Sequence, residues 1–339
     1  MTQDQSLPSR NSASADAGAV VLSVVVPMYQ EQGNAVPLLN EVRRVLDPTG
    51  ERYEIVLVDD GSRDGTWEEI GRAAEGDSRV KGIRFARNFG HQNALMAGLG
   101  MASGQAVITM DGDLQHPPSL IPEMVRAWRS GNKVVTTLRQ DGAETGLLKQ
   151  ATSRWFYQVF SYLAEVPLSA GTSDFRLLDR QVLENLLRLE CPNLFLRGAV
   201  TWLGFRAMSL PYQVGARHAG QSKYNWRRMI RFATSAVLSF STRPLLLAVW
   251  VGLLTSLAAF GELLFVFIQF LRGGTVPGWA STLTVVSFLF GVLFLLLGII
   301  GAYLGSVHQS LQNRPLFVVD TTVNLSPESH DATPGRTVR

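Results

Sequence analysis

The sequence predicts an α/β domain with a mainly parallel sheet, joined to a pair of membrane-spanning helices. Short runs rich in Val and Ile alternate with helical patterns between Val21 and Leu138, which is typical of strands and helices stacked in layers. Charge is also unevenly spread. The stretch Pro244–Gly305 has Glu262 and Arg272 as its only charged residues, whereas charged side chains are frequent in the rest of the chain. A wholly soluble chain does not have such a distribution.

The α/β prediction comes from short β-prone runs with amphipathic segments between them. Helical spacing of apolar residues is seen, for example, in Ala35–Leu46 and Ser119–Arg129. In parallel sheets, ligands bind beyond the carboxyl ends of the strands, so we expect the functional residues there. The predicted strands are Val21–Val26, Tyr53–Val58, Val80–Phe85, Ala106–Met110 and Lys133–Leu138.

Composition argues against several classes of protein. The net charge is only +3, which gives no support for binding nucleic acid. The single cysteine, Cys191, excludes an intramolecular disulfide framework and a zinc site with several thiolates. Neither the glycine-rich dinucleotide fingerprint nor the phosphate-binding P-loop follows the first strand, which runs into Pro27-Met-Tyr-Gln-Glu31.

Two of the predicted strands end in paired acids. The second strand ends at Asp59-Asp60, and we expect at least one of these to bind a ligand; Asp64 instead has the position of a helix N-cap. The fourth strand runs into Asp111-Gly-Asp113. Two carboxylates with this spacing suit Mg²⁺ or Mn²⁺, with coordination positions left for diphosphate oxygens. His116, which precedes two prolines, is expected to pack or cap rather than to bind the metal.

The apolar region contains two segments long enough to span a bilayer. Leu245–Leu271 has one charge and Trp279–Gly305 has none, and a span needs about 20 apolar residues. Arginines precede the first segment, and His308 and Arg314 follow the second, so both flanks are expected in the cytoplasm and the short link outside. The stretches around 155–162 and 222–241 mix aromatic and basic residues, which favours helices in the membrane interface. The polar start of the chain does not have the pattern of a signal peptide.

Several motifs together resemble family 2 glycosyltransferases of the GT-A fold, and among them the polyprenyl-phosphate glycosyltransferases, such as dolichyl-phosphate mannose synthases and bactoprenol glucosyltransferases. The resemblance covers residues 21–318. Gly112 is a departure, because relatives often have Ala there. The motifs are Pro27-x-Tyr29-x-Glu31, Asp59-Asp60-Gly-Ser-x-Asp-Gly-Thr, Arg87-Asn-Phe-Gly90, Asp111-Gly-Asp-Leu-Gln-His-Pro-Pro, Ser173-Asp-Phe-Arg-Leu, Phe195-Leu-Arg-Gly198 and Arg217-His-Ala-Gly-Gln-Ser-Lys-Tyr224.

This resemblance implies a role for each motif. Asp174 would act as a base or orient the acceptor or a sugar hydroxyl, and these interpretations stay open. Arg139 and Arg176 would add positive charge for the phosphates. The nucleotide would be held by Pro27, Tyr29, Glu31, Asp59, Asp60 and Asp111, the metal by Asp111, Asp113 and Gln115, and the acceptor or donor phosphate by Arg217, Ser222 and Lys223, of which Arg217 and Lys223 would also be catalytic.

The implied activity is inverting transfer of a sugar from a nucleotide diphosphate, with UDP-glucose as the best guess, to undecaprenyl phosphate. Formyl-aminoarabinose, N-acetylglucosamine, galacturonate or mannose donors fit the same motifs, and a processive polysaccharide synthase is a rival. The enzyme would be a tetramer in the bacterial inner membrane, with its catalytic domain in the cytosol. The expected parts are a disordered segment at 1–20, the catalytic domain at 21–220, an interface helix at 221–243, two membrane helices at 244–305, and a partly disordered cytosolic segment at 306–339.

Overall fold

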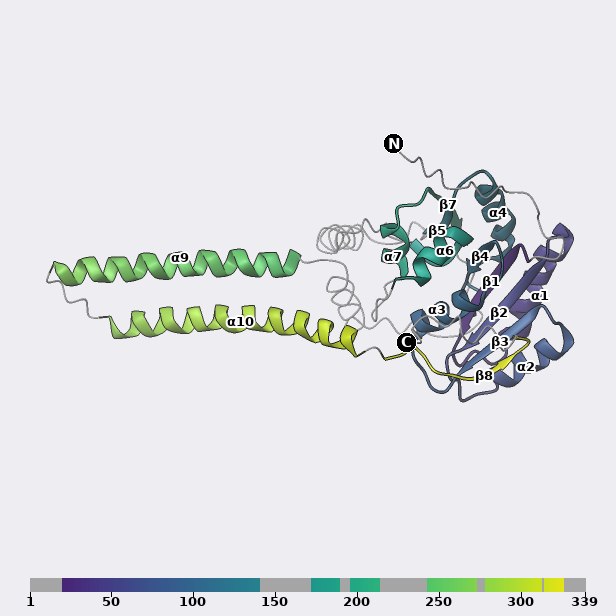
Figure 1. Cartoon of the computed structure of the whole chain (residues 1–339), viewed down its shortest axis with the longest axis horizontal. Helices are drawn as coiled ribbons and strands as arrows, with labels where there is room; N and C mark the ends of the chain where they lie inside the picture. The colour runs from purple at the N-terminus through teal and green to yellow at the C-terminus, as the bar shows by residue number, and fades with distance from the viewer. Residues whose placement is uncertain are drawn as a thin grey trace, which may run out of the picture.

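The computed structural model describes residues 20–140, 172–189, 196–213, 243–272, 278–312 and 314–325. Figure 1 shows an α/β domain from which two long helices extend side by side. The strands are β1 (Leu22–Met28), β2 (Tyr53–Asp59), β3 (Val80–Phe85), β4 (Ala106–Thr109), β5 (Val134–Gln140), β6 (Thr172–Asp179), β7 (Ala207–Gln213) and β8 (Val319–Val323). The helices are α1 (Ala35–Leu46), α2 (Thr66–Gly76), α3 (His91–Met101), α4 (Ile121–Arg129), α6 (Arg180–Leu187), α7 (Leu196–Trp202), α9 (Arg243–Leu271) and α10 (Trp279–Leu311).

Within the described residues, the strands form one sheet in the order β7-β5-β6-β4-β1-β2-β3-β8. The pairs β4–β1, β1–β2 and β2–β3 are parallel, as is β5–β7. Only β6 and β8 run against the others, because each pairs antiparallel with its neighbours. The mainly parallel sheet predicted from the sequence is thereby confirmed, and the five predicted strands correspond to β1–β5.

Helices cover both faces of the sheet, and each face has its own apolar core. On one face, α1, α2 and α4 pack with residues such as Leu38, Ile70 and Met124. On the other face, α3, α6 and α7 contribute residues such as Leu95 and Leu183. The central strands β1 and β2 are buried at every position, which explains their continuous apolar runs.

The strand register brings the polar strand ends together. Met28 at the end of β1 pairs with Asp59 at the end of β2, and Val25 pairs with Thr109 at the end of β4. The segments that follow these three parallel strands therefore leave the same edge of the sheet, as the sequence predicted for its acidic motifs.

The C-terminal part of the chain returns to this domain. The sequence predicts residues 306–339 as a separate segment, but β8 pairs antiparallel with β3 and completes one edge of the sheet. Phe317 stacks on Phe85 with 4.9 Å between ring centroids. Gly82 allows the close approach, because a Cβ there would lie 2.6 Å from Val323 Cγ1. The sheet thus includes a strand beyond the expected end of the catalytic domain at residue 220, since long-range pairing is not visible in local sequence.

The predicted apolar segments form the two long helices, which pack against each other. In the described residues, only Phe288–Gly305 of α10 is both long and apolar enough to cross a membrane by length and composition, and Leu245–Gly261 of α9 is a shorter apolar stretch. The prediction that both apolar segments are helical is thus confirmed. The interface helices predicted around 155–162 and 222–241 lie outside the described residues.

Candidate active site

A cleft of about 650 Å³ opens where the central parallel strands end. Its walls come from the segments after β1, β2 and β4 and from the loop before α3. The lining residues include Pro27, Tyr29, Glu31, Asp60, Asn88, His91, Asp111 and Asp113. A second hollow of about 410 Å³ shares Tyr29 and Asn88 with this cleft and is rich in arginine. The two spaces are therefore neighbours at the carboxyl edge of the sheet.

The two acids at the end of β2 have different surroundings. Asp59 is fully buried, and its Oδ1 accepts a hydrogen bond of 3.0 Å from Ser62 N. Asp60 lines the cleft and accepts hydrogen bonds from the backbone N–H groups of Phe89, at 2.6 Å, and Gly90, at 2.9 Å. Burial raises the pKa of both carboxyl groups. Asp60 therefore shapes the loop before α3, and Asp59 shapes the loop after β2.

The turn that contains Asp111 is held by His116. The backbone N–H of Asp111 donates to His116 Nδ1 at 3.0 Å, so the proton of the neutral ring is on Nε2, which lies 2.7 Å from Ser173 Oγ. Burial lowers the pKa of His116, which favours this neutral form. The ring is 5 % exposed and stacks on Phe175. The expectation that His116 packs and caps is confirmed.

Asp111 and Asp113 present carboxylate oxygens to the cleft. Asp111 Oδ1 is buried and has no hydrogen-bond partner among the described residues, although the side chain as a whole is 36 % exposed. Burial raises the pKa of Asp111, and the nearby imidazoles of His116 and His91 partly counter this. Asp113 Oδ1 accepts a hydrogen bond from Gln115 N at 3.1 Å.

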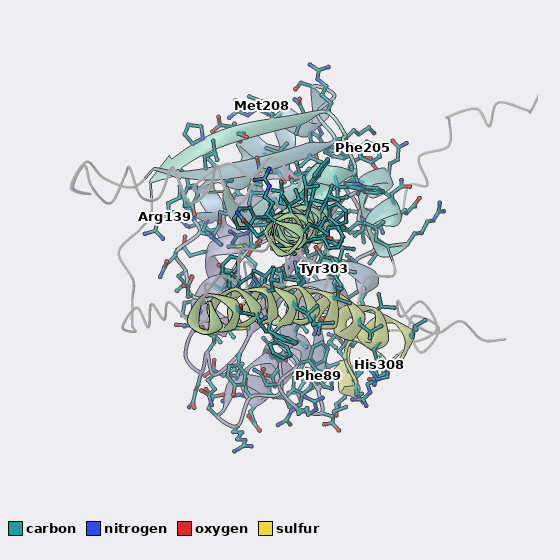
Figure 2. All side chains as sticks on the ribbon, turned by 90° about the vertical axis from the view of Figure 1, so that its left-hand side faces the viewer. Phe89, Arg139, Phe205, Met208, Tyr303 and His308 are labelled. Carbon is teal, nitrogen blue, oxygen red and sulfur yellow. The ribbon has the colours of Figure 1, made fainter. Side chains whose placement is uncertain are left out.

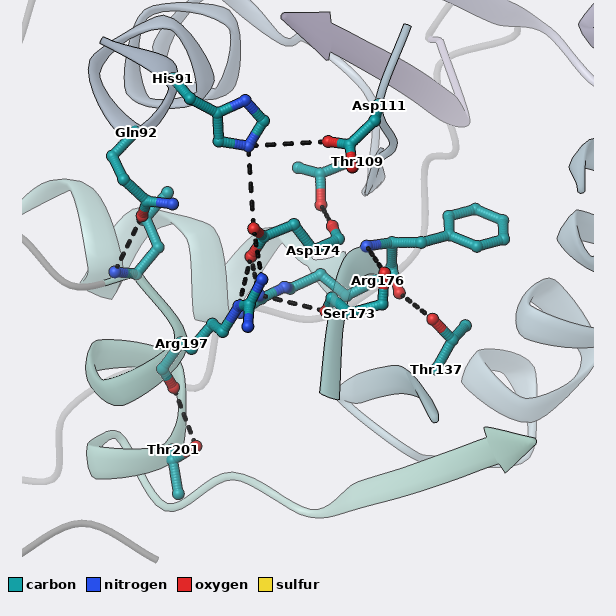
Figure 3. Close-up of polar contacts among 12 residues, drawn as sticks. His91, Gln92, Thr109, Asp111, Thr137, Ser173, Asp174, Arg176, Arg197 and Thr201 are labelled. Carbon is teal, nitrogen blue, oxygen red and sulfur yellow. Dashed lines mark hydrogen bonds and ion pairs between the residues drawn. The ribbon is translucent and has the colours of Figure 1, made fainter. Parts of the chain in front are cut away.

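A buried cluster centred on Asp174 of β6 lies near Asp111, with His91 between them (Figure 3). Arg197 of α7 donates to both oxygens of Asp174 at 2.9 Å, and Arg176 donates to Oδ1 at 2.5 Å. Burial alone would raise the pKa of Asp174, but the nearby imidazole of His91, the hydrogen bonds from Arg197 and the charge of Arg176 hold it well below its ordinary value. Two guanidinium groups around one carboxylate leave this cluster with a net positive charge. Asp174, Arg176 and Arg197 are not among the residues that line the cleft.

His91, the first residue of α3, lies between the two acidic groups. Its Nε2 is 3.6 Å from Asp111 Oδ1 and 3.7 Å from Asp174 Oδ2 (Figure 3). Burial lowers the pKa of the imidazole, but the two carboxylates outweigh this effect and raise it. Gly90 permits this placement, because its φ of 100° turns the chain immediately before the helix.

Most of the described residues that the sequence predicted for the site come together. Pro27, Tyr29, Glu31, Asp60, Asp111 and Asp113 line the cleft. Arg176 differs from its expected role as a phosphate ligand, because it is 4 % exposed and its guanidinium bonds Asp174 and Ser173 O. Gln115 and Asp59 are not among the lining residues of the cleft, and Gln115 Nε2 is buried.

Two groups of predicted residues lie elsewhere. Arg139 is exposed near the end of β5, where it pairs with Tyr212 of β7, and Figure 2 shows it beside the end of that strand. It does not line the cleft. Arg217, Ser222 and Lys223 lie outside the described residues, so their roles stay predictions from the sequence.

Sequence reasoning missed His91 and Arg197 as site residues. Both lie in or directly beside motifs that were recognised, since His91 follows Arg87-Asn-Phe-Gly90 and Arg197 belongs to Phe195-Leu-Arg-Gly198. The motifs indicated that these segments matter, but only the fold shows that both side chains meet Asp174, which is far away in sequence.

Comparison with known proteins decides the family. The model of glycosyl transferase family 2 matches residues 23–187. A bactoprenol glucosyl transferase derived from prophage SfII in Shigella flexneri is 35 % identical over 90 % of this chain and 99 % of its own. This chain belongs to glycosyltransferase family 2.

Another relative and a solved structure also match parts of this chain. An uncharacterised glycosyltransferase of Bacillus subtilis (strain 168) is 36 % identical over 89 % of this chain and 94 % of its own. Among solved structures, glucosyl-3-phosphoglycerate synthase from Mycobacterium tuberculosis has a TM-score of 0.46 at 19 % identity, over 66 % of this chain and 78 % of that one. As a family 2 enzyme, the chain is a glycosyltransferase with a GT-A-like α/β domain.

Proposed function

We propose that this glycosyltransferase moves a sugar, with inversion, from a nucleotide diphosphate to undecaprenyl phosphate at the cytosolic face of the bacterial inner membrane. UDP-glucose is the favoured donor. The observation that carries this proposal is the polar cleft at the strand ends, lined by Asp111, Asp113 and His91, in a chain that also has two long apolar helices. His91 in turn contacts Asp174 of the buried cluster. Relatives of nearly the same length are named bactoprenol glucosyl transferases, which supports the same acceptor class here.

The shape of the site suits a nucleotide diphosphate. The second hollow, lined by Tyr29, Arg84 and Arg87, offers an exposed aromatic ring and guanidinium groups for a nucleoside. The cleft shares Tyr29 and Asn88 with it and leads to Asp111 and Asp113. A donor bound across both spaces would thus have its diphosphate near the two acids and its sugar near His91 and Asp174.

The acids fit a divalent cation, Mg²⁺ or Mn²⁺. In the part of the chain that the structure describes, no cluster of three His, Cys, Asp or Glu side chains has metal-binding geometry. Asp111 nonetheless has a buried oxygen that accepts no hydrogen bond from the described residues, and Mg²⁺ sites are often built from one or two carboxylates plus phosphate oxygens. Asp111 and Asp113 would hold the ion, which would supply charge neutralisation for the leaving diphosphate. Gln115 is a weaker candidate because its side chain does not line the cleft.

The residues of this chain have two tasks at the reacting centre. The acceptor is a phosphate monoester, which is mostly ionised at neutral pH because its second pKa is about 6. The acceptor phosphate therefore needs little help from a base. It must, however, approach a diphosphate that is also negatively charged. Arg197 and Arg176 supply positive charge behind His91, which lines the cleft. Asp174 has a low pKa and is fully engaged, so an orienting role suits it better than that of a base. Arg217, Ser222 and Lys223 are predicted to complete the phosphate site.

The long helices suit an acceptor that stays in the bilayer. We propose that α9 and α10 cross the membrane as a hairpin, with both flanks on the cytosolic side, and that the enzyme is a tetramer. The mean apolarity of Phe288–Gly305 and the exposure of large side chains such as Phe288, Phe294 and Leu304 support contact with lipid. The α/β domain would then lie at the membrane surface, where it meets the lipid phosphate.

The direct test is an assay of the purified full-length chain with undecaprenyl phosphate and a panel of nucleotide sugars. We expect glucose transfer from UDP-glucose, dependent on a divalent cation. The panel includes the mannose, N-acetylglucosamine, galacturonate and formyl-aminoarabinose donors. Transfer of another sugar would change only the donor. Extension of a polysaccharide without transfer to the lipid phosphate would contradict the proposed acceptor.

A further inference from the structure

The strand β8 forms part of the wall of the second hollow. It reaches the sheet directly after α10, and its residue Asp320 lines that hollow together with Tyr29, Arg87 and Asn88. The role of this strand is not contained in the family motifs, which end before it in the sequence. The wall of this hollow is therefore built partly from the chain that returns from the long helices.

This strand is held firmly at both ends. At its start, the N–H of Ala86 donates to Val318 O at 3.0 Å, and Phe317 is buried against Phe85. At its end, Asn324 Nδ2 donates to Ala74 O at 2.7 Å and to Val80 O at 2.9 Å. A side chain on this strand consequently has a defined position relative to the loop after β3.

Asp320 occupies a β-bulge in the strand. Arg84 of β3 pairs with Thr321, and the next residue, Phe85, pairs with Val319, so Asp320 has no partner in the ladder. A bulge of this kind redirects a side chain and often lies beside an active site. In this case the redirected side chain is a carboxylate that lines the hollow.

The charges of the hollow leave the Asp320 carboxylate available for a ligand. Arg84 contacts Asp59 Oδ2 at 3.6 Å and Ser62 O at 3.4 Å, and Arg87 donates to Asn88 O at 3.2 Å. Among the described residues, Asp320 forms no ion pair. Its one hydrogen bond there comes from the hydroxyl of its neighbour Thr321, at 3.3 Å. A carboxylate accepts but does not donate, so a matching ligand group is an N–H or O–H.

We propose that Asp320 accepts a hydrogen bond from the nucleoside part of the donor, either from a base N–H or from a ribose hydroxyl. This inference rests on the proposed function, because it requires a nucleotide bound across the two neighbouring spaces. It adds a binding residue from β8 to those that the motifs supply. It also explains why the chain after α10 returns to the catalytic sheet at this edge.

The test measures binding of UDP and GDP to the full-length protein in detergent by calorimetry. Asp320→Ala removes the carboxylate that would accept the hydrogen bond. We expect the affinity of this variant for the nucleotide that the wild type binds to fall about tenfold. Asp320→Asn keeps one acceptor oxygen, so its loss should be smaller. Glu75→Gln on α2 is the matched control, because it removes the same charge from an exposed position that does not line the hollow. Melting temperatures show that each variant is folded.

Nucleotide analogues distinguish whether the base N–H or a ribose hydroxyl donates the hydrogen bond to Asp320. If the contact is to the base, N3-methyl-UDP or N1-methyl-GDP should bind the wild type and Asp320→Ala equally well. If it is to the ribose, the 2′-deoxy nucleotide should do so. Unchanged affinity of Asp320→Ala, in a protein whose wild type binds the nucleotide, would overturn this inference alone. Absence of binding of both UDP and GDP to the wild type would overturn the proposed donor site as well.

Discussion

Arg197 holds Asp174 through two parallel hydrogen bonds, Nε to Oδ1 and Nη2 to Oδ2, each 2.9 Å long. This fork geometry fixes the plane of the carboxylate as well as its charge. Arg176 binds the same carboxylate from the buried side. Asp174 is therefore pre-positioned in the site before any substrate binds.

The Arg197 contact can be tested by replacing this arginine. Arg197→Ala should lower the transfer rate about 10- to 100-fold, because Asp174 loses its orientation and the wall loses a positive charge. Arg197→Lys should not restore the rate, since an ammonium cannot form the two parallel bonds. Arg129→Ala is a control, because Arg129 pairs with Glu51 on the surface. Equal rates for wild type and Arg197→Ala would refute the orienting role.

The role of Asp174 has a signature in the pH dependence of the rate. Its pKa lies well below the ordinary value of 3.8, so Asp174 stays ionised throughout the range from pH 5 to 8. The rate should rise with pH through a pKa of about 6, which belongs to the lipid phosphate. Asp174→Asn should be slower but should keep this rise. A limb in the pH–rate profile that disappears only in Asp174→Asn would instead identify a base.

The proposed metal site predicts a sharp contrast between neighbouring residues. Asp111→Asn or Asp113→Asn should reduce transfer at least about 100-fold while the protein stays folded, because each removes an anionic ligand. EDTA should abolish activity of the wild type. Gly112→Ala is the matched control and should stay active, since its Cβ would lie 3.4 Å from Met28 Cγ, an ordinary contact. Activity that survives EDTA would exclude the metal.

The orientation of the helix hairpin can be checked by labelling. In a Cys191→Ser background, a cysteine at Thr275 in the link between the helices should react with an impermeant thiol reagent outside intact cells. A cysteine in the C-terminal tail should be protected. The reason is the excess of arginine before the first helix, which favours the cytosolic side. The reverse labelling pattern would invert the proposed topology.

An ion pair between Glu54, near the start of β2, and Lys81, near the start of β3, should control the stability of the domain in acid. Glu54 is 1 % exposed and bonds Lys81 at 2.5 Å, Ser23 Oγ at 2.6 Å and Ser103 N at 2.6 Å. Burial alone would raise the pKa of Glu54, but these partners lower it below 4.5. A lowered pKa means that the stabilisation is present above pH 4.5 and is lost as the pH falls through the folded-state value.

Glu54→Gln should accordingly destabilise the domain at neutral pH by about 3 kcal/mol, because it leaves Lys81 without its buried partner. The difference from wild type should shrink as the pH falls below about 4.5 and through the lowered folded-state pKa of Glu54, because the wild-type carboxylate is then protonated as well. Thermal unfolding at several pH values measures this. Glu75→Gln, at an exposed position of α2, is the control and should change little. A difference that is constant with pH would contradict the assignment.

Sequence alone determined much of this protein. The alternation of apolar runs indicated an α/β domain, and strand ends with acids indicated where the site lies, because parallel strands direct their carboxyl ends to one edge. The two long helices were also predicted from local sequence, since length and apolarity are properties of a contiguous segment. Asp111 and Asp113 were proposed as metal ligands from a local signal of the same kind, because they lie two residues apart just after one strand.

Only the tertiary structure decided which residues meet across the chain. Arg176, predicted to bind phosphate, instead bonds Asp174, because the alternation of side chains along β6 and the packing of α7 decide which cations face the cleft. His91 reaches Asp111 because Asp60 and Gly90 position the start of α3. The return of β8 to the sheet depends on pairing with β3, which lies near the opposite end of the sequence. No local pattern encodes such contacts, since they depend on where the whole fold brings two distant backbones together.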